Sequence, residues 1–137
     1  MSYCIFSITD FLEKKTCKHI GNSLYLNNLA EAQLSTGDLY EAEKTLKHSL
    51  KVDQKGMLTY FILGRLYKVQ KKNEESITAF NKSLVINPEL LDAQFEIAEI
   101  QFGKHEKEKA EKSIGKALSK DPANSKYKKL LDRIQSS

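Results

Sequence analysis

The sequence predicts an all-α fold, an α-solenoid of three helix-turn-helix repeats with a 34-residue period and capping helices at both ends. Three observations lead to this prediction. The chain matches itself when shifted by 34 residues, apolar residues recur at helical spacing, and glycine and proline are scarce, at six and two among 137 residues. A turn-rich all-β protein would need more of both, whereas a fixed period of roughly 20–50 residues is typical of repeat architectures.

The 34-residue shift places residues of similar size at the same position of each unit. At two such positions all the residues are small, and at a third they are all large and apolar. These sets are Ala30, Gly64 and Ala98; Ala42, Ser76 and Ala110; and Leu46, Phe80 and Ile114. We interpret the small sets as points where paired helices approach closely, and the large set as filling the space between hairpins. Since a single hairpin cannot bury its apolar face, the units should be stable only as a stack.

Each unit contains two predicted helices separated by a break. In the second unit, apolar residues follow Tyr60 at i+3 and i+7, which places them on one helical face. In the first unit Gly37 is predicted to end a helix in the left-handed conformation. Asn87-Pro88 and Asp121-Pro122 predict helix starts, with a polar N-cap followed by proline at the first helical position.

These signals divide the chain into five parts. The N-terminal part is an amphipathic capping segment, helical over residues 3–19, because Ile8 and Leu12 keep the register of the repeats. The C-terminal part is a solvating helix with an apolar stripe that includes Tyr127 and Leu131. The predicted parts are 1–22, three repeats within 23–122 (about 23–56, 57–90 and 91–124), and 123–137.

The sequence carries no recognisable catalytic, metal or nucleotide motif. His19, His48 and His105 are isolated from other ligand-type residues at metal-binding spacing. Gly103-Lys104 and Gly115-Lys116 lack the earlier glycine and the following serine or threonine of a phosphate loop. We therefore expect no enzyme activity, no metal and no cofactor.

Charge and cysteine content point to an ordinary solvated surface. The net charge of +4 comes from 22 basic and 18 acidic residues that are interspersed, which argues against nucleic-acid binding. No apolar run approaches the roughly 18 residues of a membrane span, and the N-terminus lacks the features of a signal peptide. Cys4 and Cys17 are expected to be reduced thiols, so a cytoplasmic location is predicted.

In period, helix content and residue pattern the chain resembles the tetratricopeptide repeat family. The second unit carries the resemblance most fully, through Leu63-Gly64, Tyr67, Phe80 and Pro88. The sequence departs from the family pattern at four positions. Glutamine replaces tyrosine twice, serine replaces alanine once and glutamine replaces proline once, at Gln33, Gln101, Ser76 and Gln54.

This resemblance implies a protein-interaction adaptor that binds a partner peptide or helix in the concave groove lined by the first helix of each unit. The alternative is a structural unit that self-associates through the apolar N-terminal segment or the groove. Phe61, Phe95 and Phe102 are expected to be aromatic anchors at positions that the core does not need. The implied groove residues are Leu24, Asn27, Glu31, Leu34, Leu58, Phe61, Arg65, Lys68, Asp92, Phe95, Glu99 and Phe102.

The family's carboxylate clamp holds the acidic tails of heat-shock chaperones, so the residues at the clamp positions indicate whether an acidic partner fits. Its five positions carry Asn27, Glu31, Ile62, Asp92 and Glu96 in this sequence. Three acids would repel a ligand carboxylate, so acidic tails are disfavoured. We expect instead an amphipathic partner of mixed charge, with basic residues over the third unit and acidic residues over the second.

Overall fold

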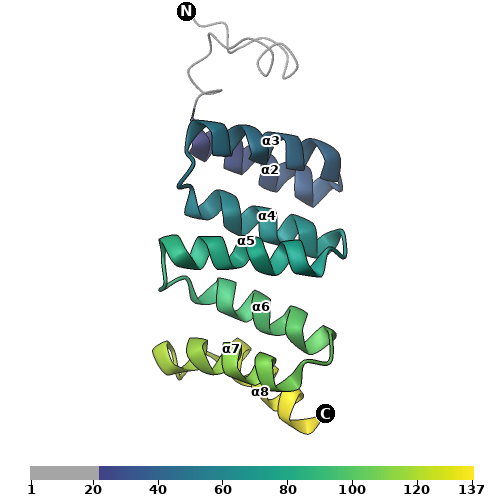
Figure 1. Ribbon diagram of the computed structural model, residues 1–137, viewed down its shortest axis with the longest axis vertical. Coiled ribbons are helices and arrows are strands. Elements are labelled where there is room, and N and C mark those ends of the chain that lie inside the picture. Colours follow the sequence, from purple (N-terminus) through teal and green to yellow (C-terminus); the bar gives the residue numbers. More distant parts are fainter. Residues whose placement is uncertain (1–21) are drawn as a thin grey trace, which may run out of the picture.

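The computed structural model describes residues 22–137, in which seven α-helices follow one another as antiparallel pairs and a final helix (Figure 1). The helices are α2 (Ser23–Thr36), α3 (Leu39–Val52), α4 (Met57–Val69), α5 (Asn73–Ile86), α6 (Leu91–Gly103), α7 (Lys107–Lys120) and α8 (Ser125–Ser136). Three hairpins, α2–α3, α4–α5 and α6–α7, stack along the long axis, and α8 closes the C-terminal end. The predicted all-α solenoid is confirmed, whereas the predicted N-terminal cap lies outside the described residues.

Large apolar side chains from the second helix of each hairpin hold the stack together. Leu46, Phe80 and Ile114 are each 0% exposed. They belong to three buried clusters that join unit 1 to unit 2, unit 2 to unit 3, and unit 3 to α8. Burying one such side chain contributes roughly 1.5–3 kcal/mol, so every unit depends on its neighbour. No helix in the described part is long and apolar enough to cross a membrane.

Hydrogen bonds between the paired helices explain three departures from the family pattern. Thr45 Oγ1 donates to Gln33 Oε1 at 2.8 Å, and Ser113 Oγ donates to Gln101 Oε1 at 2.7 Å. In the second unit, the hydroxyl of Ser76 donates to the backbone oxygen of the facing small residue, Gly64, at 2.6 Å. Each departure therefore places a buried or half-buried polar group opposite a partner, as buried polar atoms require.

Equivalent turns join the first helix of each unit to the second. Gly37 has φ 87°, as predicted, and its counterparts Lys71 and His105 each have φ 64°. The backbone closes each turn in the same way, with the residue after the left-handed one donating to a carbonyl of the preceding helix. A residue with a Cβ is strained there by about 1–2 kcal/mol, so two of the three turns carry strain that glycine would relieve.

The turns between units are β-turns that precede the next helix. Leu90 N–H donates to Asn87 O at 3.2 Å, and Asn124 N–H donates to Asp121 O at 3.3 Å. Helix α6 begins only at Leu91 and α8 only at Ser125. The prediction that Pro88 and Pro122 are the first helical residues is therefore wrong. Proline's fixed φ suits the second position of such a turn equally well.

The paired helices of unit 2 approach each other closely at Gly64, where a Cβ would lie 2.6 Å from Phe80 Cε1. We expect Gly64→Ala to lower the free energy of unfolding by about 1–3 kcal/mol, because the buried ring has no room to move. Phe80→Leu in the same chain should restore part of the loss, since unit 1 pairs Ala30 with Leu46. Urea unfolding measures both effects.

Gly115→Ala is the matched control, because nothing lies within 4 Å of a Cβ there. It should stabilise the chain by about 1 kcal/mol through helix propensity alone. If Gly64→Ala stabilised the protein as Gly115→Ala does, the close helix approach would be refuted.

The left-handed turns allow a stabilising substitution. Lys71→Gly and His105→Gly should each raise the free energy of unfolding by about 0.5–1 kcal/mol, because glycine adopts positive φ without steric strain. Lys72→Gly is the control, since Lys72 has φ −91° and gains nothing from glycine. Thermal unfolding of the three variants tests the prediction, and equal effects at positions 71 and 72 would contradict it.

Candidate partner-binding groove

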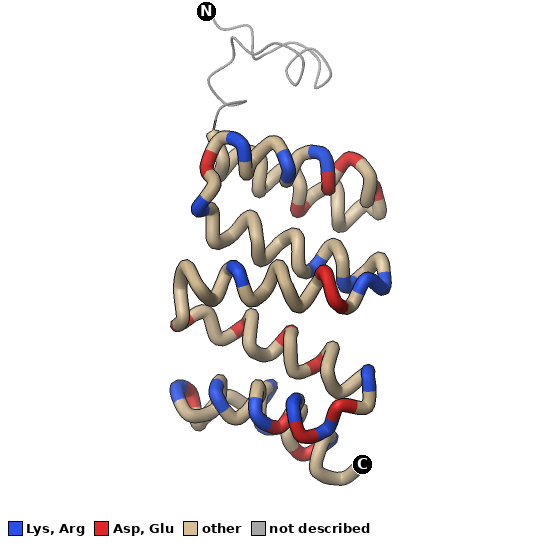
Figure 2. Tube along the Cα trace, in the orientation of Figure 1, with Lys and Arg blue, Asp and Glu red and all other residues tan. Residues whose placement is uncertain are grey.

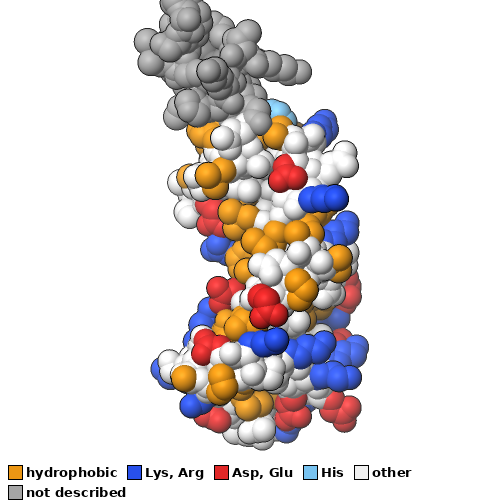
Figure 3. Space-filling model, turned by 90° about the vertical axis from the view of Figure 1, so that its left-hand side faces the viewer, with side chains coloured by type: hydrophobic (Ala, Val, Ile, Leu, Met, Phe, Trp, Pro, Cys, Tyr) orange, Lys and Arg blue, Asp and Glu red, His pale blue; other side chains and the backbone are white. Residues whose placement is uncertain are grey.

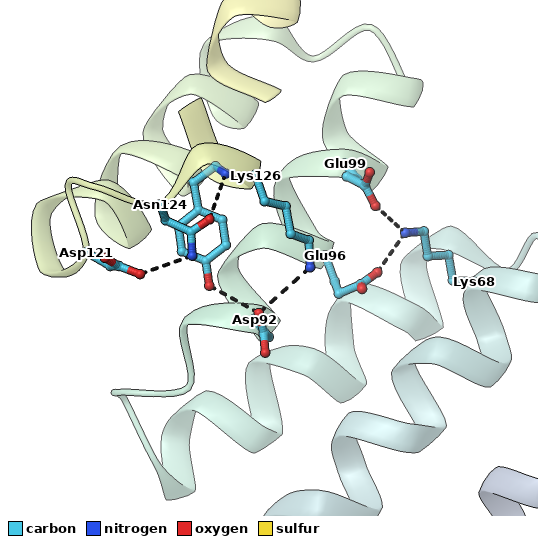
Figure 4. A network of polar contacts seen from close by, with 8 residues as sticks. Lys68, Asp92, Glu96, Glu99, Asp121, Asn124 and Lys126 are labelled. Carbon is cyan, nitrogen blue, oxygen red and sulfur yellow. Dashed lines mark hydrogen bonds and ion pairs between the residues drawn. The ribbon is translucent and has the colours of Figure 1, made fainter. Parts of the chain in front are cut away.

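The first helices carry charged residues, in their middle and last turns, that pair with one another across the units. Arg65 Nη1 donates to Glu31 Oε1 at 2.6 Å, linking α4 to α2. Lys68 Nζ donates to Glu96 Oε2 at 2.7 Å and to Glu99 Oε2 at 2.6 Å, linking α4 to α6 (Figure 4). These predicted groove residues therefore share one surface, as their register implies.

The charges on this surface are unevenly distributed between the helices. Acidic residues recur along α6, whereas the charged residues of α4 are basic and lie towards its end (Figure 2). Burial lowers the pKa of Lys68, but the hydrogen bonds with Glu96 and Glu99 and the charges of these carboxylates together outweigh burial and raise that pKa above its usual value. One cation shared by two carboxylates leaves a surplus negative charge between α4 and α6.

Helix α8 covers the third unit's share of the predicted groove. The rings of Phe95 and Tyr127 stack with centroids 5.6 Å apart, and Lys126 Nζ lies 4.2 Å from the Phe95 ring centroid. Phe95 is only 6% exposed. The prediction that the core does not need Phe95 is therefore wrong. Phe102 is half-buried against the same cluster, with Arg133 5.5 Å from its ring centroid.

Asp92 is also engaged by α8. Its Oδ1 accepts a hydrogen bond from Tyr127 Oη at 3.1 Å and lies 3.9 Å from Lys126 Nζ. Asn124, the residue before α8, donates from Nδ2 to Asp121 Oδ2 at 3.0 Å (Figure 4). This polar network anchors the start of α8, so Asp92 stabilises the closed end of the stack.

Asn27 lies in the core of the first two units. Its Oδ1 accepts hydrogen bonds from Ser49 Oγ at 3.0 Å and from Thr59 Oγ1 at 2.9 Å. Asn27 is 4% exposed, so its placement on a ligand-facing surface is corrected. The sequence analysis did not predict this network. A signal for it was present, because Asn27, Ser49 and Thr59 are polar residues at repeat positions that face the interior.

One repeated contact determines which groove positions stay open. The fifth residue of each first helix faces the third residue of the next first helix, as Asn27 faces Thr59 and Phe95 faces Tyr127. The same register pairs Phe61 with Ala93, and Phe61 packs against the buried cluster that contains Ala93. Because alanine is small, Phe61 remains half-exposed while its counterparts are buried.

The accessible apolar part of the groove therefore lies on units 1 and 2. Leu24 is 59% exposed, Leu58 is 38% exposed and Phe61 lies one turn further along α4. Leu34, in the last turn of α2, is half-buried against the cluster that joins units 1 and 2. Between the ends of α2 and α4 lies a hollow lined by residues that include Leu34, Arg65, Lys68 and Glu96. In the described residues, no three metal-ligating side chains gather into a cluster.

Comparison with known proteins agrees with this geometry. The tetratricopeptide repeat family model matches residues 24–55 and 59–90, the first two hairpins. These two hairpins are tetratricopeptide repeats. No curated protein matches its sequence.

Several solved structures share the fold of this repeat protein at low sequence identity. The first repeat domain of Spaghetti (RPAP3), bound to the HSP90 peptide SRMEEVD, is 18% identical with a TM-score of 0.78, over 83% of this chain and 90% of that one. The Yersinia enterocolitica type III secretion chaperone SycD, in complex with a peptide of the translocator YopD, is 22% identical with a TM-score of 0.70, over 81% and 85%. The Arabidopsis OM64 domain is 13% identical with a TM-score of 0.79, over 86% and 98%.

Because the Tyr127 hydroxyl helps to anchor α8, the free energy of unfolding should depend on pH in the alkaline range. Burial, the charge of Asp92 and its hydrogen bond raise the pKa of Tyr127 to about 12, above the usual value of 10.0. The unfolded chain loses the Tyr127 proton first, so the free energy of unfolding should fall as pH rises from 10 towards 12.

Tyr127→Phe isolates this effect. At neutral pH the variant should be less stable than the wild type by about 0.5–1.5 kcal/mol, because it lacks the hydrogen bond to Asp92. The difference should shrink at about pH 11–12, since phenylalanine does not titrate. Unfolding by urea at the two pH values measures it, and a difference that is independent of pH would show that Tyr127 does not titrate in this way.

Proposed function

We propose that this repeat protein is an interaction module that holds an amphipathic segment of a partner protein along the first helices of units 1 and 2. The observation that carries the proposal is the uncovered apolar surface of Leu24, Leu58 and Phe61, beside a paired charged surface. The corresponding surface of unit 3 is closed by α8. Two relatives of the same fold were solved with bound peptides, which supports binding over catalysis.

The proposed ligand has apolar side chains facing the first turns of α2 and α4 and polar ones facing their last turns. Arg65 and Lys68 already have carboxylate partners. Acidic groups of the ligand therefore gain less binding affinity from these two residues than the sequence analysis predicts. The surplus carboxylate beside Lys68 favours a ligand cation near Glu96 and Glu99. Apolar contacts supply most of the affinity in this proposal, and charge supplies orientation.

The proposal is tested with amphipathic peptides selected from a display library against the full chain. Leu58→Asp should weaken a selected peptide by about 1–3 kcal/mol, roughly 5–150-fold in Kd, because it places a charge in the apolar contact. Fluorescence anisotropy measures the Kd. Tyr40→Asp is the matched control: Tyr40 is 77% exposed and, like Leu58, is the second residue of its helix.

Equal Kd values for the Leu58→Asp and Tyr40→Asp variants would place the binding surface elsewhere. The peptide SRMEEVD is the comparison ligand, and it should bind more weakly than the selected peptides, because the surplus carboxylate beside Lys68 repels its acidic groups. Light scattering over a range of concentrations tests the alternative, self-association, for which the chain should form a stable oligomer without any peptide.

A further inference from the structure

The second helices of neighbouring units are separated by hollows whose floor is the first helix of the later unit. One hollow lies between α3 and α5 over α4, and the other lies between α5 and α7 over α6. The latter, which we call the α5–α7 hollow, has a volume of about 220 Å³. Its lining includes Asn81, Gln94, Gln101, Lys109, Lys112 and Lys116.

The two hollows occupy equivalent places in the repeat but differ in chemistry. Tyr60 and Tyr67 line the floor between α3 and α5, and both acidic and basic residues line its walls. In the α5–α7 hollow the equivalent floor residues are Gln94 and Gln101, and Lys109 replaces an acidic residue. None of the described residues that line the α5–α7 hollow is acidic. This hollow therefore offers positive charge and N–H donors without a carboxylate.

Three lysines form the α7 wall of the hollow. Lys109, Lys112 and Lys116 recur at i, i+3 and i+7, so they share one face of this lysine-rich helix (Figure 2). Lys109 Nζ lies 3.2 Å from Glu106 Oε2. The ion pairs of the described residues include neither Lys112 nor Lys116, and both residues are exposed. These two ammonium groups are therefore available to an anion.

The floor of the hollow adds neutral donors. Gln101 Oε1 accepts a hydrogen bond from Ser113 Oγ at 2.7 Å, which leaves the amide N–H groups of Gln101 to donate to a ligand. Gln94 is half-buried and supplies a second amide. Ammonium and amide N–H groups both donate to the oxygen atoms of an anion, and such charge-assisted hydrogen bonds are stronger than neutral ones.

Acidic residues limit this basic surface at both ends of α7. Glu106 precedes the helix and pairs with Lys109, and Glu89 Oε1 lies 3.5 Å from Lys120 Nζ at the end of the helix. In Figure 3, Lys and Arg side chains gather at the right of the lower half, in the part of the stack that holds the third unit. From Lys109 to Lys116 the row spans about 10 Å along the helix axis. A nucleic acid, with its long run of regularly spaced phosphates, needs a longer basic track.

We propose that the α5–α7 hollow binds a short acidic segment of a partner protein. Side chains on one face of an extended peptide recur about every 7 Å, and Lys112 and Lys116 are about 6 Å apart along the axis of α7. Two acidic residues at i and i+2 of the partner therefore match these two lysines. Their carboxylates also accept N–H groups from the floor glutamines.

This site is separate from the proposed groove. Gln94 and Gln101 line the hollow, whereas Phe95 and Phe102 belong to the face of α6 that was predicted to line the groove. Helical spacing places the two pairs on opposite sides of α6. The inference therefore does not rest on the proposed function, and the two surfaces can be occupied at the same time.

A titration of the full chain with the peptide hexaglutamate tests the proposal. Amide NMR signals are followed at low ionic strength, where exposed charges are least screened. The signals of Gln94, Gln101 and Lys112 should shift and saturate, whereas the signal of Leu58 in the proposed groove should not move. Absence of saturable shifts around the hollow would overturn the proposal.

Two double variants with the same change of charge separate the site from a general attraction. Lys112→Gln with Lys116→Gln should raise the Kd of hexaglutamate by about 10-fold or more, because both unpaired ammonium groups are lost. Lys128→Gln with Lys129→Gln is the matched control, since both lysines are exposed on α8 and do not line the hollow. The control should change the Kd by less than about 2-fold. Equal changes in the two variants would overturn the site.

Gln94→Glu tests the floor while all the lysines remain. The new carboxylate has nearly the size of the amide, pairs with the lysines itself and repels the acidic ligand, so the Kd of hexaglutamate should rise by about 3–10-fold. An unchanged urea midpoint would show that the variant is folded, and an unchanged Kd in that folded variant would contradict binding in the hollow.

A thymidine hexanucleotide of comparable charge is the comparison ligand. It should bind more weakly than hexaglutamate, because the basic row is short and its phosphates are fixed at the spacing of the nucleotide backbone. Tighter binding of the oligonucleotide with the same shifts at Gln94, Gln101 and Lys112 would assign the hollow to nucleic acid and overturn the proposed acidic protein segment.

Discussion

The packing of a large side chain from each second helix against a small residue of its paired first helix underlies the rest of this structure. An isolated hairpin would leave Leu46, Phe80 or Ile114 in water, so each unit needs the next one to complete its core. In unit 2 the Phe80 ring occupies the space that a Cβ at Gly64 would need. Phe80 also meets Phe61 edge to face, with ring centroids 5.5 Å apart. The core contact therefore positions the aromatic side chain that reaches the groove.

The backbone repeats closely along the stack, but its chemical surface does not. At equivalent positions, Thr59, Ala93 and Tyr127 face the groove residue of the preceding unit, and they make it respectively hydrogen-bonded, open and covered. A tetratricopeptide array can therefore confine its binding surface to some units while every unit keeps the same fold. Helix α8 covers both the end of the hydrophobic core and the unit 3 part of the proposed groove, because Tyr127 packs in the last core cluster and stacks on Phe95.

The charges of the groove illustrate how a repeat protein neutralises its own surface. Glu31 pairs with Arg65, which lies 34 residues later and hence at the equivalent position of the next unit. Lys68 bridges two carboxylates of the third unit. Half-exposed pairs of this kind contribute little to stability because water screens them. Their main effect is to lower the electrostatic field that a ligand would meet in the proposed groove, which would give apolar shape more weight in recognition.

Much of the fold could be predicted from the sequence because its causes are local or periodic. The 34-residue register, the helical spacing and Gly37 each act over a few residues, and the helices lie where those signals placed them. Ion pairs join Glu31 to Arg65 and Lys68 to Glu99 across neighbouring units, and the role of these residues in binding stays a prediction. The role of Pro88 was missed, because proline suits the second position of a turn as well as the first turn of a helix.

The accessibility of the groove residues was decided by the tertiary structure. Asn27, Phe61 and Phe95 occupy the same register position, yet one is buried by hydrogen bonds, one is half-exposed and one lies beneath α8. Each outcome depends on a residue 32 positions later in the chain, on the next first helix. The sequence by itself determined the period, the helices and the face to which each residue belongs. Which parts of that face meet water was determined by packing between units, because burial depends on the neighbour's side chain and not on a residue's own place in the repeat.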